Sequence, residues 1–258
     1  MYNNIPFYIV NKNSNDKVNT SNFKDPVFID LENDTIICEK STQTKIPKII
    51  HQIWIGDKSK QPTELMKTWE SMNPTWEYKL WTEENIPELF NKNQYDKMRQ
   101  YCGKADIVRY ELLYRYGGVY IDADSECINP LDDFFTEHDS FAVYENEQHK
   151  PGLIANGYMG SIQYNKLILY LMYKIYKCTN INVNQPWLIT GPQLLTNTIN
   201  ELCYDKCKIY PSHYFIPEYK TGDVYSGSDK IYSTHYWGCT TGYDNIPQKP
   251  KANINMRF

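Results

Sequence analysis

Two aspartates one residue apart, Asp122 and Asp124, close a short apolar run that follows the diglycine Gly117-Gly118. Side chains alternate across a strand, so Tyr120, Asp122 and Asp124 are predicted to share one face, with the two acidic Cα atoms about 7 Å apart. Two carboxylates at a strand end repel each other unless a cation lies between them. Hard oxygen ligands of this kind suit Mg²⁺ or Mn²⁺, which is usually shared with a substrate phosphate. The run therefore predicts a metal site for a phosphorylated ligand.

A second charged pair, Asp106 and Arg109, lies three residues apart on a predicted helix, so both side chains share a face. One interpretation is an exposed ion pair worth about 0.2–0.5 kcal/mol, which the spacing alone favours. The other has both side chains in the ligand crevice, where Asp106 accepts sugar hydroxyls and Arg109 holds charge near the phosphates. Their position, sixteen and thirteen residues before Asp122, favours the second interpretation.

Two further side chains, Trp54 and His235, are expected near strand ends. Trp54 is predicted as a core residue from sequence alone, and the alternative is stacking on a base, worth about 1–3 kcal/mol. A lone histidine such as His235 is more often structural. Two carboxylates, however, leave an octahedral metal in need of further ligands, and neutral imidazole binds Mn²⁺. His235 is therefore a candidate third ligand.

Three other interpretations of the acid pair have to be weighed. A haloacid-dehalogenase-type phosphatase would use Asp122 as nucleophile, but it normally continues into Gly and Thr, whereas Ser125-Glu126-Cys127 follows here. A calcium-binding EF-hand loop would need Gly at its sixth and Glu at its twelfth position, where Cys127 and Asp133 stand, and is rejected. The acids can also simply end a surface strand. The phosphatase and a non-catalytic nucleotide-sugar-binding module remain open alternatives.

The elements that position these residues alternate between strands and helices, which predicts an α/β fold with a largely parallel sheet. Predicted strands cover residues 48–55, 77–81, the run after Gly118 that the acid pair closes, 140–144, 208–210, 213–216 and 231–237. Predicted helices cover 62–73, a segment capped by Thr82, 103–116, a short segment from 130, 165–178 and 191–204. Residues 152–160 are predicted to be irregular because they are rich in Gly and Asn.

The carboxyl ends of parallel strands meet at the edge where such sheets bind ligands. Gly56 follows the first of these strands and the acid pair follows the third, so both belong at that edge. We expect residues 1–45 to form a lead-in with a small hairpin at 27–29 and 35–38, residues 46–245 the main domain, and residues 246–258 a tail.

Composition excludes several classes of protein. The chain has 258 residues, 41% of them hydrophobic, and a formal charge of −4, with an isoelectric point near 5.8, which argues against a nucleic-acid groove. No stretch approaches the roughly eighteen apolar residues of a membrane span, and the start lacks a signal peptide's basic region. Seven irregularly spaced cysteines indicate reduced thiols. A cytoplasmic protein without a membrane-spanning segment is expected.

Three motifs in order carry a resemblance to a known family. They read Ile46-Pro47-Lys48-Ile49-Ile50-His51-Gln52-Ile53-Trp54-Ile55-Gly56, then Ala105-Asp106-Ile107-Val108-Arg109-Tyr110, then Gly117-Gly118-Val119-Tyr120-Ile121-Asp122-Ala123-Asp124. In these the chain resembles the DXD-containing family 32 glycosyltransferases, which include yeast-type α-1,6-mannosyltransferases and bacterial capsular enzymes, and distantly the glucosyltransferase domain of large clostridial toxins. The resemblance implies a GT-A type, Rossmann-like αβα sandwich with a mixed, mostly parallel sheet.

The same resemblance implies a retaining hexosyltransferase that needs Mn²⁺ or Mg²⁺ and a nucleotide-sugar donor. UDP-glucose or UDP-galactose is the first expectation for the donor and GDP-mannose the second, with a hydroxyl of a glycan or protein as acceptor. For the nucleoside, the resemblance implies base stacking by Trp54 and contacts by Asn85 and Tyr120. It implies that Asp106 and Arg109 contact the donor sugar. It also implies that Asp122 contacts the ribose, the sugar or a metal-bound water, and that Asp124 and His235 bind the metal.

Overall fold

A six-stranded sheet lies at the centre of the computed structural model, which describes residues 7–10, 27–30, 35–38, 43–182, 185–247 and 249–250. In order across the sheet the strands are β10 (Cys207–Tyr210), β8 (Ser140–Asn146), β9 (Lys150–Ser161), β6 (Gly118–Ile121), β4 (Ile49–Ile53) and β5 (Glu77–Trp81). β9 pairs antiparallel with both of its neighbours, and the other five strands run in one direction. The mixed, mostly parallel sheet predicted from the sequence is confirmed.

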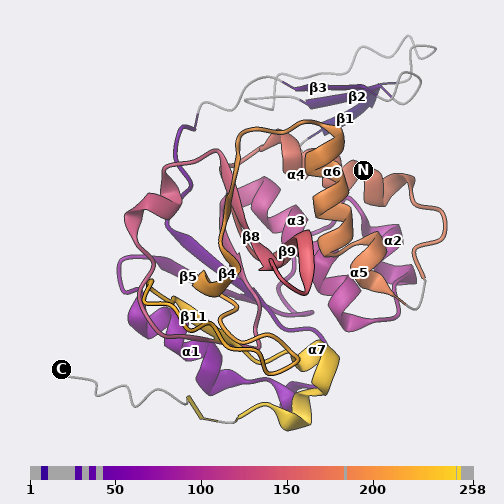
Figure 1. Cartoon of the computed structure of the whole chain (residues 1–258). Coiled ribbons are helices and arrows are strands. Elements are labelled where there is room, and N and C mark those ends of the chain that lie inside the picture. Colours follow the sequence, from indigo (N-terminus) through magenta and orange to yellow (C-terminus); the bar gives the residue numbers. More distant parts are fainter. Residues whose placement is uncertain are drawn as a thin grey trace.

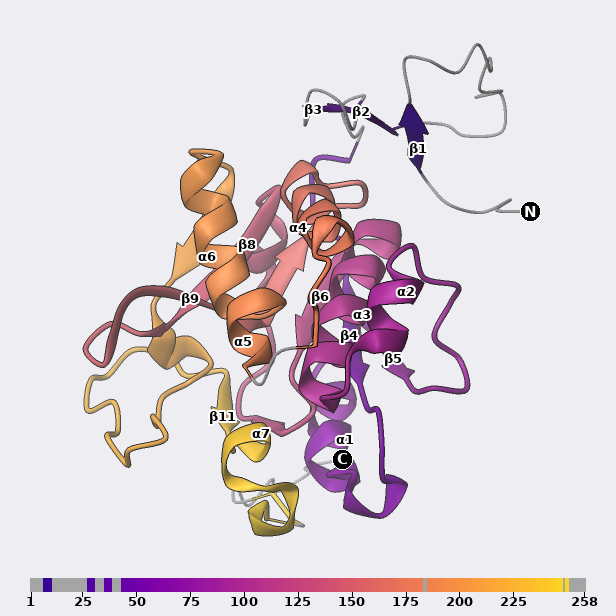
Figure 2. The same cartoon turned by 90° about the vertical axis from the view of Figure 1, so that its right-hand side faces the viewer.

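Helices cover both faces of this sheet (Figures 1 and 2). Helices α3 (Tyr101–Tyr116), α4 (Lys166–Lys177) and α6 (Pro192–Glu201) pack together with α2 (Lys92–Lys97) on one face. Helix α1 (Thr63–Met72) packs on the other, where Trp69 is fully buried. Strand β6 contributes side chains to the hydrophobic cores on both faces of the sheet. Val119 and Ile121 pack in the core that contains Trp69, and Tyr120 packs in the core on the α3 side.

Two smaller sheets accompany the central one. β7 (Ser125–Cys127) and β11 (Ser233–His235) form an antiparallel pair, which α7 (Gly238–Thr241) follows. β1 (Phe7–Val10), β2 (Val27–Asp30) and β3 (Thr35–Cys38) form a separate sheet in which β2 and β3 pair antiparallel, at the positions predicted for a hairpin. Most of the predicted lead-in and tail lies outside the described residues, so these domain limits remain predictions.

Several expected elements differ in the structure. Residues 152–160 belong to strand β9, and residues 213–216 lie in and just after the short 3₁₀ turn Ser212–Tyr214 instead of in a strand. The short helix expected from residue 130 is the 3₁₀ turn Asp133–Thr136, and Thr82 starts a single turn instead of a helix. The sequence also gave no signal for the short helices α2, α5 (Pro186–Ile189) and α7 or for the 3₁₀ turns Lys58–Lys60 and Tyr243–Asn245. None of the helices in the described part of the chain combines the length and apolar character that crossing a membrane requires.

One buried histidine fixes the junction between β4, β5 and β6. The His51 ring is fully buried, with Nε2 2.8 Å from the Gly117 carbonyl oxygen and Nδ1 accepting from Trp81 Nε1 at 3.1 Å. A carbonyl only accepts and an indole N–H only donates, so the neutral ring carries its proton on Nε2. Burial lowers the pKa of His51 to about 4, although the bond to Gly117 offsets part of that effect.

This histidine predicts a pH-dependent loss of stability. In the unfolded chain His51 takes up a proton near its ordinary pKa of about 6.5, whereas the folded protein resists protonation down to about 4. The contribution is therefore complete above pH 6.5 and is lost as the pH falls, by about 3 kcal/mol at most. Glu111, whose pKa burial raises to about 7, acts in the opposite direction. We therefore expect the difference in urea-unfolding free energy between wild type and His51→Gln to shrink between pH 7 and 4.5, and a constant difference would contradict the assignment.

Candidate active site

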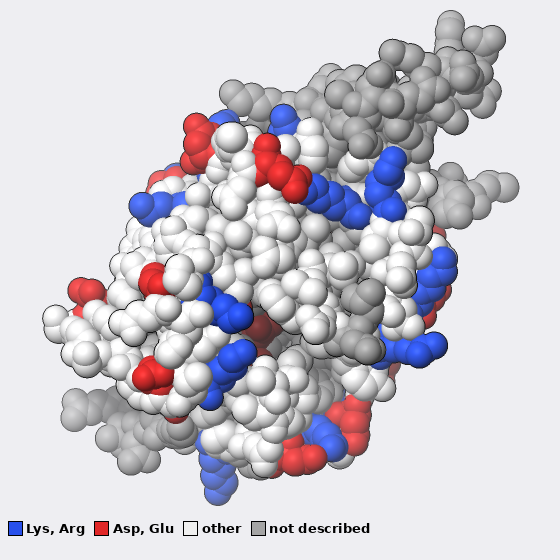
Figure 3. Space-filling view, turned by 45° about the vertical axis from the view of Figure 1, so that its right-hand side comes forward, with Lys and Arg blue, Asp and Glu red and all other residues white. Residues whose placement is uncertain are grey.

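A cavity of about 420 Å³ opens at the carboxyl ends of the parallel strands. It is lined by Trp54, just after β4, and by Asp122 and Asp124, just after β6, so both strand ends meet there as the sequence predicts. Figure 3 shows acidic atoms at the bottom of a hollow in this face, with Lys and Arg side chains beside it. A volume of this size is typical of pockets that enclose a small organic ligand.

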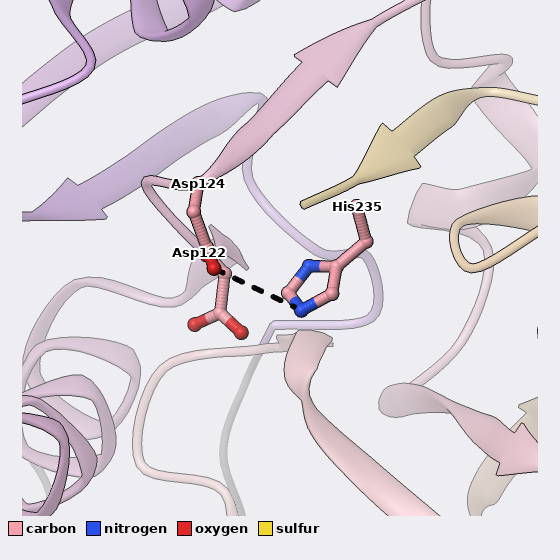
Figure 4. Close-up of side chains that lie close together, drawn as sticks. All are labelled: Asp122, Asp124 and His235. Atoms are coloured by element: carbon pink, nitrogen blue, oxygen red, sulfur yellow. Dashed lines mark ion pairs between the residues drawn. The ribbon is translucent and has the colours of Figure 1, made fainter. Parts of the chain in front are cut away.

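The acid pair lies in a turn instead of on the strand itself. β6 ends at Ile121, and the following turn aims both carboxylates toward His235 at the end of β11 (Figure 4). One ligand atom each from Asp122, Asp124 and His235 lie within 4.8 Å of one another, and His235 Nε2 is 4.0 Å from Asp124 Oδ2. The third residue predicted for the cluster is thus brought to it from 111 residues further along the chain.

Asp124 is the most enclosed member of this cluster. Its side chain is buried, and its Oδ2 accepts a hydrogen bond of 2.5 Å from the Gly238 backbone N–H. Burial raises the pKa of Asp124, nearby Asp122 adds to that effect, and His235 lowers it in part. Two carboxylates and an imidazole are a donor set that suits Mn²⁺ or Mg²⁺, and a divalent cation would offset the cost of burying these charges. The residues therefore fit the metal that the sequence implies.

Arg109 joins the acid pair to helix α3. Its Nη2 lies 3.2 Å from Asp106 Oδ1 and 3.2 Å from Asp122 Oδ1, and its Nη1 donates to the Asn156 carbonyl oxygen. Burial opposes the positive charge, but Tyr120 and the two carboxylates raise the pKa of Arg109 above its ordinary value. The spacing correctly predicts the ion pair with Asp106. Both side chains are buried and line the cavity, as the favoured interpretation expects, and the exposed alternative is wrong.

Asp106 is held from three sides. Besides Arg109, Thr190 Oγ1 donates to its Oδ2 and Asn156 Nδ2 donates to its Oδ1, each at 2.9 Å. Burial raises the pKa of Asp106, and these three partners offset part of that rise. Asn156 also donates to Tyr110, whose hydroxyl donates to the Thr190 carbonyl oxygen. The network fixes the carboxylate at the cavity wall.

A bulge in β9 supplies site residues that sequence reasoning missed. Ala142 of β8 pairs with Met159 and the next residue pairs with Ala155, so residues 156–158 have no partner on β8. Asn156 and Gly157 lie in this bulge, and a Cβ on Gly157 would come within 2.2 Å of Asp122 Oδ2. A larger residue here would therefore displace the Asp122 carboxylate from this position. The signal available in the sequence was the Asn156-Gly157 pair inside a strand-like segment.

The three predicted nucleoside contacts have different outcomes. Trp54 is 6% exposed and packs edge-on against Tyr243, with ring centroids 4.9 Å apart, so it is a core residue that also lines the cavity. Tyr120 lines the cavity as well, and its hydroxyl donates to Asp122 Oδ1 at 2.9 Å. Asn85 is not among the cavity-lining residues; its side chain instead bonds the backbone of Thr82 and Leu80.

Trp237 closes the cavity beside His235. Its φ of 56° is left-handed, which costs a bulky residue of the order of 1–3 kcal/mol and is concentrated at functional sites. The indole N–H donates to the Glu218 carbonyl oxygen, and the ring stands edge-on to His235 at 4.7 Å between centroids. The backbone strain is therefore maintained by contacts that also pack the histidine.

Sequence comparison matches one part of the chain, which includes the acid pair, Asp106 and Arg109, to a known family model. Residues 59–141 match the family described as the glycosyltransferase sugar-binding region containing DXD motif. The chain is 32% identical over 162 residues to inositol phosphoceramide mannosyltransferase 3 of Schizosaccharomyces pombe, which covers 58% of this chain and 44% of that protein. It is 30% identical over 166 residues to an uncharacterized glycosyltransferase of Acanthamoeba polyphaga mimivirus, covering 60% and 65%. The chain thus spans less than two thirds of either relative.

Two solved structures share the fold of this chain. The PaToxG glycosyltransferase aligns with a TM-score of 0.52 at 16% identity, covering 61% of this chain and 70% of that one. The catalytic domain of alpha-toxin from Clostridium novyi aligns with a TM-score of 0.51 at 11% identity, covering 62% and 73%. At such identities the likeness establishes the fold alone, which is the GT-A type expected from the sequence.

Proposed function

We propose that this chain, a member of the DXD-containing glycosyltransferases with the GT-A fold, transfers a hexosyl group from a nucleoside-diphosphate sugar to a hydroxyl acceptor. The observation that carries the proposal is the cluster of Asp122, Asp124 and His235 beside the buried Arg109, at the end of a cavity large enough for a sugar nucleotide. An anionic donor can dock there only if the acidic wall is neutralised.

The proposed roles follow from the contacts. A divalent cation held by Asp122, Asp124 and His235 would neutralise charge on the departing diphosphate. Arg109, already fixed between Asp106 and Asp122, adds permanent positive charge at the same wall. Asp106 is held by three fixed donors, Asn156, Thr190 and Arg109. It is proposed to accept from donor-sugar hydroxyls with its remaining lone pair, and not to attack the anomeric carbon as a nucleophile. Without a free carboxylate nucleophile, front-face attack with retention of configuration is the proposed course.

The donor is proposed to be a GDP- or UDP-hexose, with a mannosyl donor ranked first. The sequence resemblance ranks UDP-glucose and UDP-galactose above GDP-mannose. The relatives named as mannosyltransferases, the first of which is 32% identical, favour the reverse order. Trp54 is proposed to contact the base from the cavity wall. A glycan or glycolipid hydroxyl is proposed as acceptor, and a cytoplasmic location remains a prediction.

The proposal predicts metal-dependent donor binding and turnover. A thermal-unfolding panel of GDP-mannose, UDP-glucose, UDP-galactose and a CMP-sugar, each with Mn²⁺ or EDTA, is expected to show one donor class that raises the midpoint by roughly 5–10 °C at a hundredfold excess over Kd, and only with metal. The same donor should release its nucleoside diphosphate on incubation. Stabilisation without release or transfer would instead indicate a binding module. A fluoroberyllate adduct on Asp122 with indifference to every nucleotide would indicate a phosphatase.

A further inference from the structure

Trp187 is an exposed aromatic side chain in the wall of the cavity. Five large apolar side chains are exposed within the described residues, and two of them, Tyr101 and Trp187, also line the cavity. Trp187 is 39% exposed. On an open surface a single exposed apolar residue needs no explanation, but in the wall of a binding cavity it is a contact surface for a ligand.

Trp187 lies at the end of the cavity where Asp106 is proposed to hold the donor sugar. It belongs to the short helix α5, and Thr190, which follows that helix, donates to Asp106 Oδ2 at 2.9 Å. A Cβ built on Gly191 would lie 2.8 Å from Trp187 Cα and 3.3 Å from Asp106 Oδ2, so the backbone of Trp187 and this carboxylate approach the same point. The indole is therefore carried by a segment that is fixed to the donor-sugar residue.

The other exposed aromatic residue, Tyr101, belongs to the nucleoside end of the cavity. It lies against Gly56, just after β4, where an added Cβ would come within 2.9 Å of the tyrosine ring. Trp54, which is proposed to contact the base, is two residues away and packs edge-on against Tyr243 at 4.9 Å between ring centroids. Of the two exposed rings, Trp187 is thus the one beside the donor sugar.

The indole of Trp187 is restrained by Lys150 at the start of β9. The Lys150 ammonium lies over the ring, 5.5 Å from its centroid. An ammonium over a tryptophan face is attracted by the negative charge of that face, so this contact holds the ring in place. The same negative face attracts C–H groups of a ligand. A pyranose ring offers a flat patch of such C–H groups, while its hydroxyls point outward to polar partners.

We infer that Trp187 is the stacking surface of the acceptor subsite, and that the acceptor is a pyranoside whose sugar ring packs on the indole. The inference deepens the proposed function, on which it rests for the place of the donor sugar. In the transfer the acceptor oxygen bonds to the anomeric carbon, the bond from that carbon to the diphosphate breaks, and the hydroxyl proton leaves with the diphosphate. The acceptor hydroxyl must therefore be held beside the donor sugar, which is where Trp187 lies.

The first test observes the Trp187 ring directly and needs no turnover. Protein labelled with fluorotryptophan is studied by ¹⁹F NMR, and Trp187→Phe identifies the Trp187 resonance among the six tryptophans. Methyl α-mannopyranoside, methyl β-galactopyranoside and n-hexanol are added separately, each in the presence of Mn²⁺ and GDP or UDP. We expect at least one pyranoside to shift the Trp187 resonance more than n-hexanol does. No shift with any of the three, or a shift with n-hexanol as large as with either pyranoside, would overturn the inference.

The second test measures transfer to the pyranoside that gives the larger shift. Trp187→Ala is expected to raise the KM for this acceptor by about 10-fold or more, with a much smaller change in the KM for the donor. Leu188→Ala is the matched control, because Leu188 is the next residue of α5 and is 38% exposed, yet is not among the residues that line the cavity. This control should keep the wild-type KM for the acceptor. An equal rise in Leu188→Ala would count against the inference, because loosening of α5 would then explain both results.

The two tests separate the inference from the proposed function. A pyranoside that shifts the Trp187 resonance in a protein that turns over no donor would support the sugar-stacking surface and contradict the transferase. Donor turnover with an acceptor KM that is the same in wild type and Trp187→Ala would support the transferase and contradict the inference.

Discussion

Replacing Asp124 by asparagine is expected to abolish metal-dependent donor turnover while leaving the fold intact. The substitution keeps size and shape but removes a carboxylate from the cluster with Asp122 and His235. Stabilisation of developing charge by a bound metal is worth several kcal/mol. At about 1.4 kcal/mol for each factor of ten, a loss of about 10³-fold in kcat is expected.

The same substitution should not destabilise the metal-free protein. The amide oxygen of asparagine can still accept from the Gly238 N–H, so the contact between the acid pair and α7 is kept. Burial raises the pKa of Asp124, which means that the folded protein disfavours its negative charge. Removing that charge is therefore expected to leave the unfolding free energy in EDTA unchanged or to raise it.

The measurements are donor hydrolysis, and thermal unfolding with Mn²⁺ and with EDTA. Wild type should be stabilised by Mn²⁺ and Asp124→Asn should not. Asp96→Asn is the matched control, because Asp96 makes an exposed ion pair with Lys92 on α2 and should behave as wild type. Retention of both turnover and Mn²⁺ stabilisation in Asp124→Asn would remove Asp124 from the proposed metal site.

The segment from α3 to the acid pair could be predicted because local rules decide it. Helical spacing up to Tyr116, the glycine stop and the apolar run fix α3 and β6, and their connection is too short to allow another arrangement. Asp106 and Arg109 follow from the same helix. Their position before Asp122 favoured a place in the crevice, but the partners that hold the pair there, Thr190 and Asn156, could not be predicted because they come from other parts of the chain.

The bulge in β9 shows where sequence reasoning fails. Its three residues are without partners on β8, yet Tyr158 still pairs with Ile121 of β6, and the Gly157 carbonyl oxygen accepts from the Asp122 N–H. Two neighbouring strands decide such a register together, and no local propensity encodes it. Residues 152–160 were predicted to be irregular because of their Gly and Asn content. That content does mark the bulge, but the strand that surrounds the bulge was not predicted.

The turn at Thr82 shows a local signal that was correct but incomplete. Asn85 Oδ1 accepts from the Thr82 N–H, and the backbone N–H groups of Asn85 and Ile86 bond the Thr82 carbonyl oxygen. Pro87 follows directly, and a proline ring inside a helix lacks the N–H and clashes with the preceding turn. The helix expected there therefore stops after one turn, and Asn85 is used as a local cap.

Replacing Arg109 by methionine is expected to be among the most destabilising single changes in the domain. Methionine fills similar space but leaves the buried Asp106 carboxylate, and the partly exposed Asp122, without their cation. Breaking a buried ion pair by removing one partner costs about 3–5 kcal/mol, because the remaining charge stays in a poorly solvated position. Urea unfolding should show this loss as a lower midpoint with an unchanged slope.

A double variant separates the charge from the packing. In Arg109→Met with Asp106→Asn the uncompensated carboxylate is gone, while Asn156 and Thr190 can still bond the amide, so part of the lost stability should return. Turnover should stay absent, since the cation at the cavity wall is still missing. Arg99→Met, at an exposed arginine before α3, should cost no more than about 0.5 kcal/mol. If the double variant were less stable than Arg109→Met alone, the ion pair would not be the reason that Arg109 stabilises the fold.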